Sequence, residues 1–269
     1  MSADLLVLDL DGVVVDAAMR VDPVLEAGVR QAGARGLRVT VATGRMPPGA
    51  RPYWERLGIT TPVIVYNGAL VRDPVKGTSL FTRSLPPGFP WKIYPIVSLA
   101  RVHPLFFREE QLYCLERTAP VVKYCEEQGL TVEEISDREV FLRSGAFIKG
   151  LFIGDSAALA ALREELAPAL DGARLVLSRP HYLELLPAGV SKGEALKFLA
   201  RHLGISLARV IAVGDQENDI EMIQTAGIGV AMSHSPPHVR AAARRVAPPP
   251  EAGGLTALLA SLCPEHFAR

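Results

Sequence analysis

Two aspartates near the start of the chain have the spacing and surroundings of a catalytic site. Asp9 and Asp11 flank Leu10 at the end of the apolar segment 5–10. Alternation along a strand directs two such side chains to one face, where their charges repel unless a cation or a shared proton compensates. Gly12 lets the chain turn sharply and brings backbone N–H groups close to a ligand. Taken alone, the pattern fits an acidic surface turn equally well.

A second acidic cluster follows another apolar segment, 210–213. Asp215 stands directly after Gly214, and Asp219 comes four residues later. By itself this cluster could cap a helix, because Asn and Asp favour helix starts. Two acidic strand ends in one parallel sheet are better explained by a hard cation, and Mg²⁺ prefers oxygen ligands. The sequence therefore predicts a Mg²⁺ site shared by the two clusters.

Two further segments offer groups that bind anions. Thr43 and Gly44 follow the apolar segment 37–42 and provide a hydroxyl beside a glycine turn. Lys192 stands at the predicted start of a helix, where a cation and the helix N-terminus together form an anion site. In isolation, Lys192 fits a solvated lysine better, because most lysines are exposed.

The elements that would position these residues alternate between strand and helix. Apolar segments 5–10, 37–42 and 62–66 predict buried strands, and Asp22-Pro23 predicts the start of a helix between the first two. The last part of the chain continues the alternation. Its predicted helices are 191–203, 219–226, 238–245 and 255–262, and its predicted strands are 210–213 and 228–231. This order predicts an α/β fold, a Rossmann-like doubly wound parallel sheet with helices on both faces.

The middle of the chain differs from both ends. Prolines and aromatics become frequent after residue 85, and segments 111–115 and 174–177 predict antiparallel strands beside a helix over 156–170. We therefore expect a second, α+β domain inserted into the first. The expected boundaries are 1–84 for the first part of the core, 85–185 for the inserted domain and 186–269 for the second part of the core.

Composition narrows the possible partners and location. The 269 residues are 49% hydrophobic and 22% charged, and the formal net charge is zero, which disfavours nucleic acid as a partner. We expect no membrane span, because the longest uncharged run, 222–239, contains Gly, Pro and His. No secretory signal is recognised, and three scattered cysteines suit a reducing compartment, so a cytoplasmic location is expected. A monomer and a homodimer are equally compatible with the sequence.

The four motifs together resemble those of a known enzyme family. Asp9-Leu10-Asp11-Gly12, Thr43-Gly44-Arg45, Lys192 at a helix start and Gly214-Asp215 with Asn218-Asp219 follow the order found in the haloacid dehalogenase (HAD) superfamily. The large insertion between the second and third motifs resembles the α+β cap of the Cof-type phosphatases, and Asn67-Gly68-Ala69 also matches that subgroup. The resemblance implies that the inserted domain, 85–185, is a cap that determines substrate specificity. Val13 departs from the threonine that many relatives carry after this first motif.

The resemblance implies a role for each motif residue. Asp9 would be the nucleophile that forms a phospho-aspartate, and Asp11 would act as acid and then as base. Mg²⁺ would be held by Asp9, by the backbone carbonyl of Asp11 and by Asp215. The resemblance further implies that the substrate phosphate is bound by Gly12, Thr43, Gly44, Lys192 and Asn218, and that Asp219 orients Lys192 and the metal's water ligands.

The implied activity is hydrolysis of a small phosphorylated metabolite, with a sugar phosphate as the first candidate. A phosphotransferase or phosphomutase with the same motifs, or a non-catalytic phosphometabolite-binding protein, stays open as an alternative. Arg45 fits substrate binding and a surface salt bridge about equally. The six histidines show no metal-binding spacing and are expected to be structural or exposed: His103, His181, His202, His234, His238 and His266.

Overall fold

The computed structural model describes residues 3–249 and 253–267, which form two compact units. The first unit takes the described residues of 1–45, 50–81 and 191–269, and the second takes 46–49 and 82–190. The main divisions between the units fall after Phe81 and after Val190, and the expected domain boundaries after residues 84 and 185 stay predictions. The role of the second unit as a specificity cap stays a prediction.

A five-stranded parallel sheet forms the centre of the first unit, in the order β14-β13-β12-β1-β2. Its strands are β1 (Leu5–Leu8), β2 (Arg38–Val41), β12 (Val210–Gly214), β13 (Ile228–Met232) and β14 (Arg245–Ala247). The strands nearest the sheet centre are almost wholly apolar because both faces are covered. The α/β fold class predicted from the sequence is confirmed.

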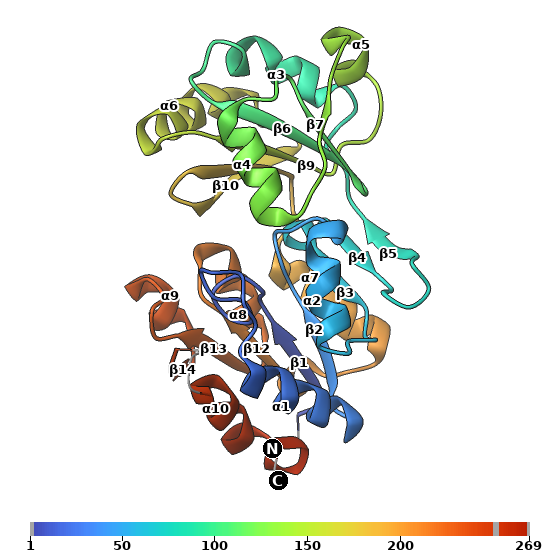
Figure 1. The fold of residues 1–269 in the computed structure, drawn as a ribbon, viewed down its shortest axis with the longest axis vertical. Coiled ribbons are helices and arrows are strands. Elements are labelled where there is room, and N and C mark those ends of the chain that lie inside the picture. Colours follow the sequence, from blue (N-terminus) through green and yellow to red (C-terminus); the bar gives the residue numbers. More distant parts are fainter. Residues whose placement is uncertain (1–2, 250–252, 268–269) are drawn as a thin grey trace. The chain divides into compact units, whose positions relative to one another are not determined.

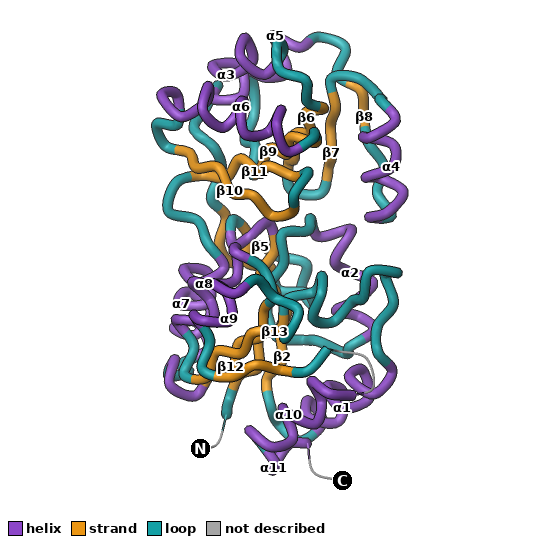
Figure 2. The backbone as a smooth tube through the Cα atoms, turned by 90° about the vertical axis from the view of Figure 1, so that its left-hand side faces the viewer, coloured by secondary structure: helices purple, strands orange, loops and turns teal. Residues whose placement is uncertain are grey.

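Helices cover both faces of this sheet (Figures 1 and 2). One group contains α1 (Pro23–Ala34), α10 (Gly254–Leu262) and α11 (Pro264–Phe267), and the other contains α7 (Lys192–Leu203), α8 (Ile220–Thr225) and α9 (Pro237–Ala242). Figure 2 shows the two groups on opposite sides of the strands. Asp22 accepts a hydrogen bond from the Val24 backbone and starts α1, as the sequence predicted. None of the described helices is long and apolar enough to cross a membrane.

The third predicted strand forms a small sheet of its own. Strands β3 (Val63–Val65), β4 (Leu70–Arg72) and β5 (Ser79–Thr82) are adjacent in that order. A single parallel bridge between Ala42 and Ile64 still places β3 beside the end of β2. Helix α2 (Pro47–Arg56), which the sequence did not indicate, crosses the division between the units at residue 50.

The prediction of a helix over 238–245 is wrong at its C-terminal end. Helix α9 ends at Ala242, and Arg245–Ala247 forms β14 in parallel register with β13. The segment is short, and Arg245 and Val246 are exposed at the sheet edge, so little apolar alternation marks it as a strand.

The second unit is an α+β domain with a six-stranded sheet in the order β10-β11-β9-β6-β7-β8. Its strands are β6 (His103–Arg108), β7 (Gln111–Cys114), β8 (Glu133–Glu134), β9 (Lys149–Ile153), β10 (Ala173–Arg179) and β11 (Tyr182–Pro187). Its helices are α3 (Phe89–Val97), α4 (Ala119–Gln128), α5 (Arg138–Arg143) and α6 (Ser156–Leu166). Side chains from α3, α5 and α6 share one apolar core with the sheet, which gives this unit a core of its own.

Candidate active site

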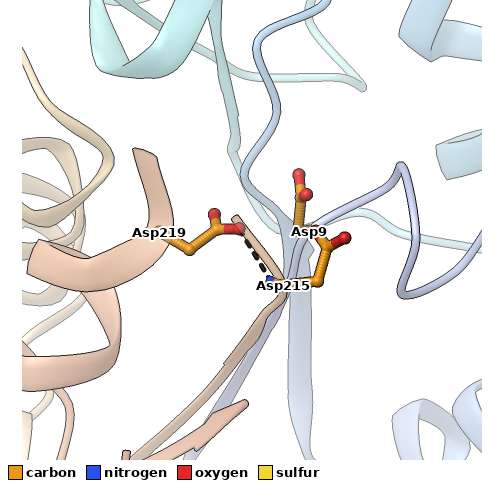
Figure 3. A group of neighbouring side chains, drawn as sticks. All are labelled: Asp9, Asp215 and Asp219. Carbon is orange, nitrogen blue, oxygen red and sulfur yellow. Dashed lines mark hydrogen bonds between the residues drawn. The ribbon is translucent and has the colours of Figure 1, made fainter. Parts of the chain in front are cut away.

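Adjacent strands of the parallel sheet bring Asp9 and Asp215 together. Strands β1 and β12 are paired from Leu5 to Leu8, and the Asp9 backbone N–H donates to the carbonyl of Val213 at 2.9 Å. Both aspartates are buried directly after the strands end. Figure 3 shows their carboxylates side by side at the strand tips, with Asp219 reaching in from the next helical segment. The carboxyl edge of the sheet, where open α/β sheets bind ligands, therefore carries the acidic residues.

Lys192 neutralises part of this acidic cluster. Ser191 caps α7 by accepting a hydrogen bond from the Glu194 backbone, which places Lys192 at the first helical position. The Lys192 ammonium lies 2.8 Å from Asp9 Oδ1 and 2.7 Å from Asp219 Oδ1, and its side chain is only 1% exposed. Burial alone lowers the pKa of Lys192, but Asp219 and Asp9 outweigh it and raise the pKa above its usual value. The solvated lysine considered from the sequence is thus excluded.

Asp219 has hydrogen bonds to both of its carboxylate oxygens. Oδ1 accepts from Lys192, while Oδ2 accepts from the backbone N–H groups of Asp215 at 3.0 Å and Gln216 at 3.1 Å. These contacts fix the turn that presents Asp215 and fix the position of the Lys192 ammonium. The role expected for Asp219, which is to orient Lys192 and the metal's water ligands, stays a prediction.

The cluster is suited to a hard cation. Asp9, Asp215 and Asp219 offer oxygen atoms within 4.8 Å of one another. Asp215 Oδ1 is buried and has no hydrogen-bond partner, an arrangement that costs free energy unless a ligand such as a cation binds there. Burial and the neighbouring charge of Asp219 raise the pKa of Asp9 well above its usual value, although Lys192 opposes them. Oxygen donors with excess negative charge are what Mg²⁺ binds.

Arg45 forms a close ion pair with Asp11, and the pair is buried on the arginine side, which excludes the surface salt bridge that was one of the two alternatives left open by the sequence. Its Nε lies 2.9 Å from Asp11 Oδ2 and its Nη2 lies 2.6 Å from Oδ1. The guanidinium also lies over the ring of Tyr53, 4.8 Å from the centroid, and only 4% of the Arg45 side chain is exposed. Burial tends to lower the pKa of Arg45, yet Asp11 raises it above its usual value, so the pair is ionised. The Asp11 carboxylate, 28% exposed, faces solvent more than Asp9 does.

Three of the expected phosphate-binding residues, Thr43, Gly44 and Asn218, are linked to one another through Asn67. The Asn67 backbone N–H donates to the Thr43 carbonyl at 2.9 Å, and its side-chain oxygen accepts from Asn218 Nδ2 at 2.9 Å. A Cβ added at Gly44 would lie 3.1 Å from Asn67 Nδ2, so glycine allows the close approach. Asn218 Oδ1 is buried without a partner. Asn67 joins the site through its positive φ of 54°, which the Asn-Gly pair in the sequence favours.

Gly12 packs directly against Asp215. Its φ is +83°, and an added Cβ would lie 2.3 Å from Asp215 Oδ2. Only glycine therefore fits between the first and the last acidic motif.

His234 is a site residue that the sequence did not reveal. Its Nε2 lies 3.4 Å from Asp215 Oδ2, on the loop that follows β13. It stands after a parallel strand, as Asp9, Thr43 and Asp215 do, and that position was the available signal. The structure shows no contact of another histidine with these acidic groups among the described residues.

Comparisons with known proteins identify relatives of the whole chain. The family model of haloacid dehalogenase-like hydrolases matches residues 6–259. The HMP-PP phosphatase of Serratia proteamaculans (strain 568) is 32% identical over 86% of this chain and 84% of that protein. The phosphoglycolate phosphatase of Methanoculleus marisnigri is 28% identical over 98% of each chain. A haloacid dehalogenase-like hydrolase from Bacteroides thetaiotaomicron has a similar structure, with a TM-score of 0.89, 25% identity and coverage of 97% and 100%.

Proposed function

Because this chain belongs to the haloacid dehalogenase-like hydrolases, we propose that it is a Mg²⁺-dependent phosphatase that forms a phospho-aspartate on Asp9. The resemblance to this superfamily and its Cof-type phosphatases is confirmed, as is the expectation of an enzyme of the phosphatase class. The cation, the covalent intermediate and the substrate are our proposals. The observation that carries them is the buried contact of Asp9 with Lys192 beside the unpartnered Asp215 oxygen.

Asp9 is the proposed nucleophile. Lys192 binds Oδ1, which leaves Oδ2 to attack phosphorus while the ester P–O bond breaks. The leaving alkoxide takes a proton from Asp11. In the second step Asp11 takes a proton from water, the water oxygen bonds to phosphorus, and Asp9 is released with inorganic phosphate.

The Arg45 ion pair constrains this proton transfer. An Asp11 carboxylate held by Arg45 is deprotonated, which is the state needed to activate water in the second step. To protonate the leaving group in the first step, Asp11 must rotate away from Arg45 and take up a proton, either from water or from a singly protonated substrate phosphate. Arg45 is therefore proposed to position Asp11.

Asp9, Asp215 and the backbone carbonyl of Asp11 would hold Mg²⁺. Bound Mg²⁺ supplies positive charge that offsets repulsion between the nucleophile and the phosphate and the charge that develops during transfer. Lys192, the Thr43 hydroxyl, Asn218 and the backbone N–H groups of Gly12 and Gly44 are proposed to bind phosphate oxygens, with Asp219 holding Lys192 in place.

A chemical trap tests the intermediate. A brief reaction with substrate and Mg²⁺, an acid quench and borohydride reduction convert an aspartyl phosphate into homoserine, which mass spectrometry locates. We expect it at Asp9 in the wild type and nowhere in Asp9→Asn, which should also lose turnover. Full activity of Asp9→Asn would exclude this mechanism.

The substrate is proposed to be a small phosphate monoester. Curated relatives are named for different substrates, HMP-PP and phosphoglycolate, so the core motifs alone do not select one. A panel of sugar, nucleotide, cofactor and polyol phosphates, ranked by kcat/KM, identifies the class, with sugar phosphates tested first. Selectivity is proposed to come from the second unit.

The same panel separates the two alternatives. A phosphotransferase consumes ester without releasing an equal amount of inorganic phosphate, because a second hydroxyl accepts the phosphoryl group. A non-catalytic binding protein turns over no ester. Equal amounts of consumed ester and released phosphate are the result we expect.

A further inference from the structure

The two oxygens of the Asp215 carboxylate have different surroundings. Oδ1 is buried without a hydrogen-bond partner, whereas Oδ2 accepts from Gln216 Nε2 at 3.0 Å and lies 3.4 Å from His234 Nε2. Gly12 also packs against Oδ2, where an added Cβ would come within 2.3 Å. One oxygen is thus enclosed by protein groups and the other lacks a partner.

Gln216 is fixed by the turn that carries Asp215. Its side chain accepts a hydrogen bond from the Asp219 backbone, while the Asp219 carboxylate accepts from the Gln216 backbone, a reciprocal capping arrangement. Because the amide oxygen faces the Asp219 N–H, the amide nitrogen faces Asp215. The hydrogen bond to Oδ2 follows from the local fold.

His234 stands on a loop that is also held at several points. The backbone N–H of Ser233 donates to Ala247 at 2.8 Å, and that of Ser235 donates to Met232 at 3.1 Å. Arg240 on α9 donates to the carbonyls of Ser233 and Ser235, on either side of His234. The position of the imidazole near Asp215 is therefore set by the backbone on both sides.

We propose that Gln216 and His234 hold Oδ2 of Asp215 so that this carboxylate binds its cation through Oδ1 alone, which favours Mg²⁺ over Ca²⁺. Mg²⁺ requires near-octahedral geometry with short bonds, while Ca²⁺ accepts more ligands and often takes both oxygens of one carboxylate. A carboxylate restricted to one oxygen suits the smaller ion. Both residues act through Asp215 and are positioning residues. The inference rests on the proposed function, because it requires the cation to bind at Asp215.

Cation binding by the metal-free protein tests the proposal without turnover. Binding of Mn²⁺ is measured by electron paramagnetic resonance of the free ion, and the Kd values of Mg²⁺ and Ca²⁺ are measured by competition with Mn²⁺. The variants are His234→Ala, Gln216→Ala and the double variant. Asp215→Asn is the reference for loss of the site, and His238→Ala, an exposed histidine on α9, is the matched control.

Each single variant should raise the Kd of Mg²⁺ by about tenfold, the lower end of the effect typical for groups that orient metal ligands. The Kd of Ca²⁺ should rise less, so the ratio of the Ca²⁺ Kd to the Mg²⁺ Kd should fall by about fivefold or more in the double variant. His234→Gln, which keeps a donor, should restore most of the Mg²⁺ affinity, and His238→Ala should leave both Kd values unchanged.

Three results would overturn the proposal. They are unchanged Kd values in both single variants, equal weakening of Mg²⁺ and Ca²⁺, and tighter binding after removal of His234. Weak Mn²⁺ binding by Asp215→Asn together with normal Mn²⁺, Mg²⁺ and Ca²⁺ binding by both His234→Ala and Gln216→Ala refutes this inference and leaves the proposed function standing. Absence of Mn²⁺, Mg²⁺ and Ca²⁺ binding in the wild type refutes the metal in the proposed function. Thermal unfolding in EDTA shows whether each variant is folded, and His234 is 40% exposed, so its replacement disturbs little packing.

Discussion

Replacement of Lys192 by methionine tests the charge balance of the site, because no other described contact brings a cation to Asp9. Methionine keeps most of the apolar stem and removes the ammonium. In the metal-free protein, Asp9 then loses its ion pair, and Asp219 retains only its two backbone hydrogen bonds. Three carboxylates with oxygen atoms within 4.8 Å of one another would have no cation among them.

The expected loss is large. Removing one partner of a buried ion pair typically costs about 3–5 kcal/mol, because the remaining charge stays buried without compensation. Here the ammonium is 1% exposed and contacts two carboxylates, so we expect a loss in that range. Lys197→Met, on the same helix, removes an exposed pair with Glu194 and should cost less than about 0.5 kcal/mol.

The loss should depend on pH in a defined direction. Burial and then Asp219 raise the pKa of Asp9 in the folded protein above its unfolded value of about 3.9. A carboxyl group with a raised folded-state pKa lowers the free energy of unfolding fully above that pKa. The destabilisation decreases as the pH falls from the folded-state pKa toward the unfolded-state pKa. The pKa of Lys192 is raised, so the stability that its ammonium contributes to the folded protein is constant around neutral pH and is lost only above about pH 10.4. The deficit of Lys192→Met should therefore shrink on acidification from pH 8 to pH 5.5.

Urea unfolding in EDTA, followed by fluorescence, measures this effect. Trp54 is buried in the unit that carries the site, and replacing Trp91, in the other unit, by phenylalanine leaves Trp54 as the reporter. Adding Mg²⁺ should recover part of the lost stability, and adding Asp9→Asn to Lys192→Met should also recover part. A loss below about 1 kcal/mol at pH 8, or a loss that grows on acidification, would refute the reasoning.

Three further predictions concern Arg45, Gly68 and the cation. Arg45→Met should lower kcat for alkyl phosphates by about 10²-fold or more. The loss of kcat for p-nitrophenyl phosphate should be smaller, because a good leaving group needs less proton donation from Asp11. Equal losses for the two substrates would contradict the proposal that Arg45 positions Asp11. Gly68→Ala, whose Cβ would lie 2.2 Å from the Ser191 carbonyl at φ +96°, should cost about 2–5 kcal/mol in urea unfolding. Gly36→Ala, at φ +92° with nothing within 4 Å, should cost about 1–2 kcal/mol, and equal losses would rule out the contact with Ser191. Mg²⁺ at a hundred times its Kd should raise the free energy of unfolding of the wild type by about 2.7 kcal/mol relative to EDTA. The same Mg²⁺ concentration should stabilise Asp215→Asn by much less. An equal gain in the two proteins would show that the cation binds elsewhere.

The parallel sheet and most of its acidic edge could be predicted because strand ends are marked in the sequence. Buried parallel strands are continuous apolar segments, so the residue at which each one stops is visible without the structure. Asp9 and Asp215 could be placed at one edge for that reason. The same rule applied to β13 would have indicated His234, which stands two residues after Met232. Spacing between histidines along the chain does not reveal it, because its partner Asp215 lies on a different strand end.

Properties that depend on tertiary contacts could not be predicted in the same way. The burial of Arg45 results from its pairing with Asp11 and its stacking on Tyr53, neither of which leaves a local pattern. In the second unit, helix α3 begins at Phe89 and contains Pro95, so its proline-rich sequence gave no helical signal. Its side chains are fixed by packing in the core of that unit.

The charges of the site suggest an order of events. The Asp11–Arg45 pair is neutral as an ion pair, whereas the three clustered carboxyl groups face one ammonium and keep two negative charges in excess when all three are ionised. A phosphate dianion approaching this metal-free edge meets net repulsion in a buried setting, where charges interact strongly. One divalent cation would balance the excess. It would also lie beside Asp215 Oδ1, which has no hydrogen-bond partner in the protein. We therefore expect substrate binding, as well as chemistry, to require the cation, because both short contacts of Lys192 are already with carboxylates.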